Sequence, residues 1–320
     1  MPCVLEQRGG QTEAIHPFSA LAVRDGRVTA ALGDMADTSF RSGAKPFQLA
    51  CSLDAMGSPG LPERWLAIGA SSHSAEPSHL ELVRSVLAGF ELGADDLQCG
   101  THPPANADAA FALAREGVEF GPIHNNCSGK HAFMLAACQA QGWPLDYRPY
   151  DHPLQRLIVH KLRSWCRDTQ PGLMIDGCGV PTFFLPLGAI AHAWSEMATA
   201  MRGDKDDLLG RIGLAMARHP LLVAGTGRLE PALVAAATEP MAAKIGAMGL
   251  FCVALPARGL GVAVKVASGS TDALAIAVPA ALERLAPGAI ELPEDWPWAT
   301  VRNWVGADVG VRRAVVGERC

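Results

Sequence analysis

The sequence predicts an α+β fold in which an antiparallel sheet, built from strands at both ends of the chain, packs against a mainly helical middle. Strand-like hairpins lie near both ends, helical periodicity fills the region between them, and strands do not alternate with helices as in a parallel sheet. The chain has 320 residues, of which 49% are apolar and 18% charged, enough to bury a large core. We therefore predict one domain over residues 1–320.

The terminal strands are indicated by two hairpin signals. Residues 21–32 form two short strand-like runs around Asp25-Gly26, a dipeptide suited to a tight turn. Residues 249–256 and 260–268 form a second pair around a turn that ends in Gly259. Sheet strands are therefore expected near both ends of the chain.

The middle of the chain is expected to be helical, with proline and glycine at most helix boundaries. The predicted helices cover residues 42–56, 78–90, 107–116, 128–141, 153–167, 186–201, 206–218 and 231–238.

Composition favours a small-molecule partner. The net charge is −5 and the 27 Lys and Arg residues are scattered, so no basic patch for nucleic acid or anionic membrane is expected. Apolar stretches such as 184–194 and 274–282 are far shorter than the ~20 residues of a membrane-spanning helix. No export signal is visible, and nine scattered cysteines fit reduced thiols. We predict a cytoplasmic protein.

A serine and a lysine are spaced for nucleophilic catalysis at the start of the first predicted helix. Because Pro46 is tolerated only in the first turn, Ser42 should lie at or beside the N-cap, with Lys45 on the same face. A lysine with a lowered pKa can accept the proton of a serine hydroxyl. The alternative is that Ser42 only caps the helix and Lys45 is solvated.

Two cysteine-containing loops form a second candidate site. Spacing alone makes Cys127, His131, Asp176 and Cys178 the first candidates for metal ligands. The alternative is that both cysteines are small buried apolar residues.

Four segments, 42–45, 70–76, 126–131 and 176–182, together resemble the rhizobial-type, or class 3, L-asparaginase family. Further matches lie at residues 217–220, 225–228, 261–265 and 303–306. The resemblance implies a fold like that of serine β-lactamases and penicillin-binding proteins. It also implies an amidohydrolase that converts L-asparagine to L-aspartate and ammonia, binds zinc and forms a homodimer.

The family's chemistry depends on two Ser–Lys pairs. Carried over, the resemblance makes Ser42 and Lys45 one pair, and Lys265 with a serine of segment 70–76 the other. We choose Ser72 for the second pair. The alternatives in the same segment are Ser71 and Ser74.

The resemblance also implies a zinc ion held by Cys127, Lys130 and Cys178, with a fourth position open to water. This set replaces the ligands suggested by spacing alone. Three protein ligands and a water are typical of catalytic rather than structural zinc. The remaining candidates, as substrate contacts or as neighbours of the ligands, are Arg41, His131 and Asp176.

The predicted mechanism is attack by Ser42 on the substrate amide, proton transfer to Lys45, and hydrolysis of the acyl-enzyme, assisted by Ser72 and Lys265. The main alternative is a non-catalytic zinc-binding or thiol-sensing protein. Glutaminase activity is a lesser alternative, because one methylene changes discrimination by only ~1–3 kcal/mol. A β-lactamase-like acyl-serine enzyme is disfavoured because residues 265–267 read Lys-Val-Ala instead of Lys-Thr-Gly.

Overall fold

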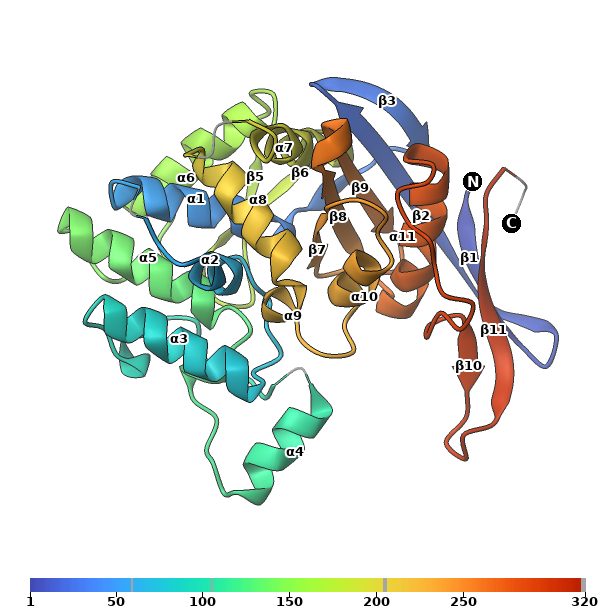
Figure 1. Ribbon diagram of the computed structural model, residues 1–320, viewed down its shortest axis with the longest axis horizontal. Coiled ribbons are helices and arrows are strands. Elements are labelled where there is room, and N and C mark those ends of the chain that lie inside the picture. The colour runs from blue at the N-terminus through green and yellow to red at the C-terminus, as the bar shows by residue number, and fades with distance from the viewer. Residues whose placement is uncertain (59, 105, 204–205, 318–320) are drawn as a thin grey trace.

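The main sheet is antiparallel and combines strands from both ends of the chain (Figure 1). The structure, a computed structural model, describes residues 1–58, 60–104, 106–203 and 206–317. The strands of the main sheet are β1 (Cys3–Arg8), β2 (Gln11–Arg24), β3 (Arg27–Leu32), β7 (Ala242–Gly246), β8 (Leu250–Leu255), β9 (Leu260–Val266), β10 (Thr300–Arg302) and β11 (Asp308–Val315). Their order is β10-β11-β1-β2-β9-β8-β7, with β3 also pairing with β2.

The first predicted hairpin is confirmed. Asp25 and Gly26 link β2 to β3 with φ angles of 47° and 75°, the two positive values that a type I′ turn requires. The second predicted hairpin is β8 and β9, where Gly259 takes a φ of 58° at the turn. The α+β fold with an antiparallel sheet from both chain ends is therefore confirmed.

A small second sheet lies within the helical part and has the order β4-β6-β5. Its strands are β4 (Asp37–Ser39), β5 (Gly172–Ile175) and β6 (Pro181–Pro186). The helices are α1 (Lys45–Ala55), α2 (Glu63–Gly69), α3 (Pro77–Gly89), α4 (Ala107–Arg115), α5 (Ser128–Gln141), α6 (Pro153–Trp165), α7 (Leu187–Ala200), α8 (Leu208–Arg218), α9 (Pro220–Val223), α10 (Leu229–Ala235) and α11 (Thr271–Leu285).

Helices cover both faces of the main sheet. One face packs with α7 and the other helices of the middle segment around fully buried Trp194 and Phe47. The opposite face packs against α11 through apolar residues such as Val264 and Leu274. Figure 1 shows most helices on the left and α11 beside β1, β2 and β11 on the right.

All eight predicted helices are present, with ends shifted by up to three residues. The prediction missed α2, α9 and α11. Two of these are short, and α11 is largely buried and contains Pro279, so it lacks the one-sided apolar pattern of a surface helix. It also missed the outer strands β1, β10 and β11, whose charged residues dilute an alternating pattern.

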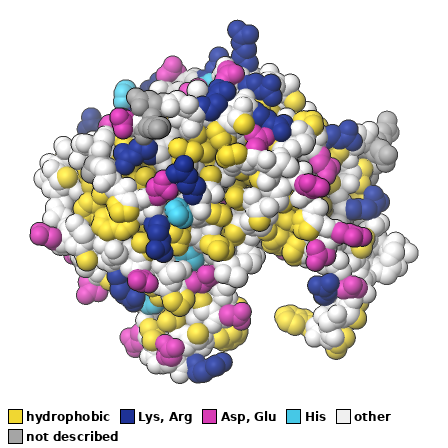
Figure 2. All heavy atoms as spheres, in the orientation of Figure 1, with side chains coloured by type: hydrophobic (Ala, Val, Ile, Leu, Met, Phe, Trp, Pro, Cys, Tyr) yellow, Lys and Arg dark blue, Asp and Glu magenta, His cyan; other side chains and the backbone are white. Residues whose placement is uncertain are grey.

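Within the described residues, no helix is both long and apolar enough to span a bilayer. The most exposed helix is α4, which has no buried residue and stands out from the body in Figures 1 and 2. The β10–β11 hairpin also projects, and it carries the fully exposed Trp304 at its end.

Candidate active site

Ser42 lies in a short 3-10 turn, η1 (Arg41–Ala44), that runs directly into α1. Pro46 occupies the first turn of α1, as predicted, but the N-cap position is taken by Ala44. Ser42 thus lies two residues before the N-cap, and the alternative in which Ser42 only caps the helix and Lys45 is solvated is not supported. Before the α-helix begins, the turn forms 3-10 bonds from Gly43 N–H to Phe40 C=O and from Lys45 N–H to Ser42 C=O. Ser42 and Arg41 are partly exposed to solvent, whereas Gly43 and Ala44 are buried.

Lys45 is completely buried and donates three hydrogen bonds through Nζ. The acceptors are Ser71 O at 2.6 Å, Ser72 Oγ at 2.8 Å and Asn126 O at 3.2 Å. The structure thus places the Lys45 amine directly against Ser72. Among the described residues, the hydrogen bonds of this amine do not include one to Ser42, the partner expected from the sequence.

The segment that carries Ser72 is fixed by the hydroxyls on either side of it. Ser71 Oγ donates to Ile68 O at 2.7 Å, and Ser74 Oγ donates to Ala224 O at 2.8 Å. Both hydroxyls therefore stabilise backbone, whereas the Ser72 hydroxyl faces a buried amine. This arrangement favours Ser72 over its two neighbours as the second serine of the site.

The described hydrogen bonds of Lys265 do not include one to Ser72 or to another serine of segment 70–76. Its Nζ donates to Met248 O and Val266 O, both at 2.6 Å, and the side chain is only half buried. The expected pair between Lys265 and Ser72 is therefore not formed, because the Lys265 amine is held by backbone carbonyls at the end of β9.

A different lysine lies close to the cluster, and the sequence analysis missed it. Lys244 on β7 is completely buried, and β7 packs against η1, the turn that carries Ser42. Burial lowers the pKa of Lys244 to about 8; the Glu230 carboxylate opposes this shift and the charge of Lys45 adds to it. A lone lysine within the apolar run of residues 241–246 was the available signal.

The two cysteine-containing loops meet next to Lys130. Lys130 Nζ donates to Cys178 Sγ at 3.2 Å, and all three side chains of the Cys127, Lys130 and Cys178 cluster are buried. A hydrogen bond from Cys178 lowers the pKa of Cys127 well below its usual range, despite burial. Burial lowers the pKa of Lys130, but the cysteines and Asp176 raise it more. Cys127 is therefore prepared to be a thiolate.

This donor set fits a zinc ion. Two sulfurs and one amine are soft or borderline donors of the kind that zinc accepts, provided that the amine loses its proton. The ligands suggested by spacing alone are not gathered, since no group of three or more His, Cys, Asp or Glu side chains in the described part of the chain could hold a metal. His131 is instead bonded through Nδ1 to Tyr147 Oη at 2.6 Å.

An ion pair links the Ser42 turn to the loop of Cys178. Arg41 Nε donates to Asp176 Oδ1 at 2.8 Å, and Asp176 is nearly buried. Burial raises the pKa of Asp176, but the charges of Lys130 and Arg41 lower it more. Asp176 is thus an anion between the Ser–Lys cluster and the Cys–Lys cluster.

The sequence model of the L-asparaginase II family matches residues 4–314. The chain belongs to this family. The prediction of an asparaginase, and hence of an amidohydrolase, is confirmed at the level of the family. No curated protein matched this chain.

Solved structures show more distant similarity. Mglu in its native form is 16% identical with a TM-score of 0.43, covering 83% of this chain and 63% of Mglu. A putative β-lactamase from Bacteroides dorei is 15% identical with a TM-score of 0.40, covering 81% of this chain and 88% of the other. EstCE1, described as a hydrolase with promiscuous acyltransferase activity, is 11% identical with a TM-score of 0.40. The match covers 88% of this chain and 91% of EstCE1. This chain thus spans less than two thirds of Mglu.

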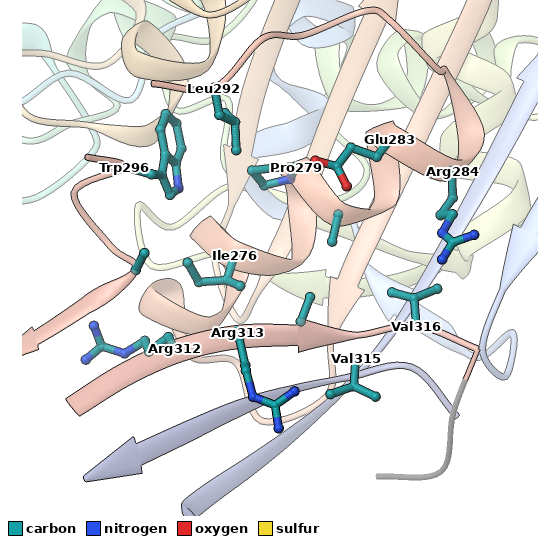
Figure 3. Close-up of a pocket in the computed structure, with 13 residues that line it drawn as sticks. Ile276, Pro279, Glu283, Arg284, Leu292, Trp296, Arg312, Arg313, Val315 and Val316 are labelled. Carbon is teal, nitrogen blue, oxygen red and sulfur yellow. The ribbon is translucent and has the colours of Figure 1, made fainter. Parts of the chain in front are cut away.

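A cavity of about 490 Å³ lies elsewhere, between α11 and β11 (Figure 3). Trp296 and Ile276 line its apolar side, and Arg312 and Arg313 lie along the strand beside it. None of the predicted site residues borders this cavity. It lies on the face of the sheet that packs with α11, whereas the Ser–Lys cluster lies among the helices of the opposite face.

Proposed function

We propose that this chain is an L-asparaginase of the rhizobial type, which hydrolyses L-asparagine to L-aspartate and ammonia through an acyl-enzyme. The observation that carries the proposal is the buried Lys45 amine, which is held 2.8 Å from the Ser72 hydroxyl and one helical turn from Ser42. A buried lysine beside serine hydroxyls is a suitable base for activating a nucleophile.

The hydrogen bonds of Lys45 define the direction of proton transfer. In its neutral form the amine has two N–H groups, which the carbonyls of Ser71 and Asn126 can accept. The lone pair then faces the Ser72 hydroxyl, which becomes the donor of that hydrogen bond. Ser72 can therefore pass a proton to Lys45 and receive one from a second hydroxyl.

We assign that second hydroxyl, and the attack on the substrate, to Ser42. It is partly exposed, whereas Ser72 is buried and its hydroxyl is engaged by Lys45. Ser42 Oγ forms the bond to the side-chain carbonyl carbon of asparagine while its proton moves through Ser72 to Lys45. The same proton is returned to the leaving nitrogen as the C–N bond breaks, and water then hydrolyses the ester.

Lys244 takes the place that the sequence analysis gave to Lys265. It is buried, its charge interacts with that of Lys45, and its strand packs against the turn of Ser42.

Zinc belongs to the same proposal, with Cys127, Lys130 and Cys178 as the residues that would hold it. A bound zinc ion polarises a carbonyl oxygen or orders the surrounding loops. The thiolate character of Cys127 and the ion pair between Arg41 and Asp176 prepare this chain for a cation beside the Ser42 turn. A homodimer, which the family resemblance implies, and the cytoplasmic location expected from the sequence complete the proposal.

The test is ammonia release from L-asparagine and L-glutamine by the purified protein, its Ser42→Ala and Ser72→Ala variants, and Thr29→Ala as a control remote from the site. We expect release from asparagine that falls at least ~1,000-fold in Ser42→Ala. Mass spectrometry of the quenched reaction should find the acyl group on Ser42. Metal analysis should find zinc in the wild type and less in Cys178→Ala.

Other outcomes would separate the alternatives. Bound zinc without ammonia release from either amide would favour the non-catalytic binding protein. An acyl group on Ser72 would move the attacking hydroxyl to that residue. Equal turnover of both amides would make the enzyme a glutaminase as much as an asparaginase.

A further inference from the structure

Glu230 is a buried carboxylate in the first turn of α10 that accepts hydrogen bonds from two residues of β7. Its Oε1 accepts a hydrogen bond from Lys244 Nζ at 3.2 Å and another from Ile245 N–H at 3.2 Å. Both partners of the ion pair are almost inaccessible, with exposed side-chain fractions of 1% and 0%. The carboxylate therefore fixes the Lys244 amine through the side chain and the backbone of the same strand.

A buried ion pair of this kind needs an explanation beyond stability. Replacing such a pair with apolar residues is often neutral or stabilising, because desolvation of two charges offsets their attraction. The Oε2 atom of Glu230 is also buried and has no hydrogen-bond partner among the described residues. An imperfectly satisfied buried charge is typical of a functional site.

The surroundings of Lys244 make Glu230 its main source of negative charge. The charged and titratable groups that face it are Glu230 on α10, Lys45 on α1, Arg228 before α10 and Cys252 on β8. Lys45 and Arg228 oppose the charge on Lys244, and the buried Cys252 thiol is neutral because burial raises its pKa well above its usual range.

The hydrogen bonds of Lys244 show what the charged form provides. As an ammonium, Nζ has three protons, and its described acceptors are Glu230 Oε1 and Ile245 O. One proton therefore remains available, whereas a neutral amine would have none to spare.

We propose that Glu230 is a positioning residue that holds the Lys244 amine in place and keeps it protonated on β7, the strand that packs against the turn of Ser42. The inference rests on the proposed function and extends it. Glu230 itself does not touch the substrate; it acts through Lys244.

The decisive measurement is the pH dependence of kcat/KM in wild type and Glu230→Gln. Glutamine keeps the shape and can still accept from Ile245 N–H, but it removes the negative charge. Because a neighbouring opposite charge shifts a pKa by about 1–3 units, the alkaline limb should move to lower pH by about that amount. At a pH just below the wild-type limb, kcat/KM should fall about tenfold or more.

Two further variants keep the result interpretable. Glu239→Gln removes the carboxylate of another partly buried ion pair, with Arg258, and should leave the alkaline limb in place. Glu230→Asp keeps the negative charge but moves it away from Lys244. The alkaline limb of kcat/KM in this variant should therefore also move to lower pH, by less than in Glu230→Gln. This variant provides the test if Glu230→Gln does not fold.

A wild type that releases no ammonia would contradict the proposed function. An active wild type whose alkaline limb is unchanged in folded Glu230→Gln, or in Glu230→Asp when glutamine does not fold, would overturn this inference alone.

Discussion

Arg41 adopts an unusual backbone conformation directly before the proposed nucleophile. Its φ angle is 44°, in the left-handed region that residues with a β-carbon rarely occupy. The guanidinium donates to Asp176, two positions before Cys178. The strained position and the ion pair together join the turn of Ser42 to one of the loops proposed to hold zinc.

We expect Arg41→Ala to reduce kcat/KM by about tenfold or more while the protein remains folded. Without the guanidinium, Asp176 is left with Lys130 as its principal cation, and the Ser42 turn loses its link to the Cys178 loop. The pKa of Asp176 should rise, because one of the charges that lowers it is gone. Steady-state kinetics with L-asparagine, with zinc content measured in parallel, provides the test.

Arg302→Ala is the matched control, because it removes an arginine from a largely exposed ion pair with Asp308. It should keep wild-type kinetics. If Arg41→Ala retained full activity and zinc content, the ion pair would have no part in assembling the site.

At the scale of secondary structure, the sequence indicates local features better than outer strands and turns. The Asp25-Gly26 hairpin and the helix around Ser128 follow from turn chemistry and periodicity within a short window. The position of Ser42 cannot be predicted from such local features, because its 3-10 turn is set by contacts with β7 and the small sheet. Lys244 was missed for a related reason: two lysines occupy similar apolar strands, and only the packing of β7 against η1 distinguishes Lys244 from Lys265.

The packing of β9 against α7 depends on one small residue. A β-carbon at Gly261 would lie 2.5 Å from the carbonyl carbon of Trp194 and still closer to the backbone of Ala191 and Ser195. Backbone atoms of a buried helix cannot move away independently, so β9 and α7 would have to separate.

Gly261→Ala should therefore destabilise the protein by about 1–3 kcal/mol or more, the usual range for overpacking a core. Urea denaturation followed by far-UV circular dichroism measures the effect. The control is Gly188→Ala in α7, where the nearest neighbouring atom, on Leu21, is at an ordinary 3.7 Å. That variant should be neutral or slightly stabilising, and equal stability of the two variants would contradict the close approach.

At the scale of the whole molecule, the site is assembled from segments that are distant in sequence. Lys45 contacts residues 71, 72 and 126, and Lys244 pairs with residue 230 on a separate helix. Motif resemblance could list most of these residues, but the partners of each amine depend on how the helices pack on the sheet. For this reason the sequence predicted the segments that carry the site residues, but not which serine or carboxylate pairs with each lysine.

Buried thiols give the whole molecule a predictable response to alkaline pH. Burial raises the pKa of four cysteines to about 12, from an ordinary value of 9.0. These are Cys51, Cys99, Cys138 and Cys166. Between pH 9 and 12 the unfolded chain releases protons that the folded chain keeps, so these thiols reduce stability as pH rises. Lys244 acts in the opposite sense, because its pKa falls from 10.5 to about 8 on folding.

At alkaline pH, the loss of stability caused by the four buried thiols should exceed the gain of stability from Lys244. At pH 10 each thiol reduces the free energy of unfolding by roughly 1 kcal/mol, and four of them exceed the gain of roughly 2–3 kcal/mol from Lys244. Urea denaturation midpoints under reducing conditions should therefore be lower at pH 10 than at pH 7.5. Cys166→Ala should narrow this difference between the two midpoints. Leu162→Ala, a truncation without a titrating group in α6, the helix that ends just before Cys166, should lower both midpoints and leave the difference unchanged. A wild type equally stable at both pH values would show that the thiols ionise as readily inside the fold as outside it.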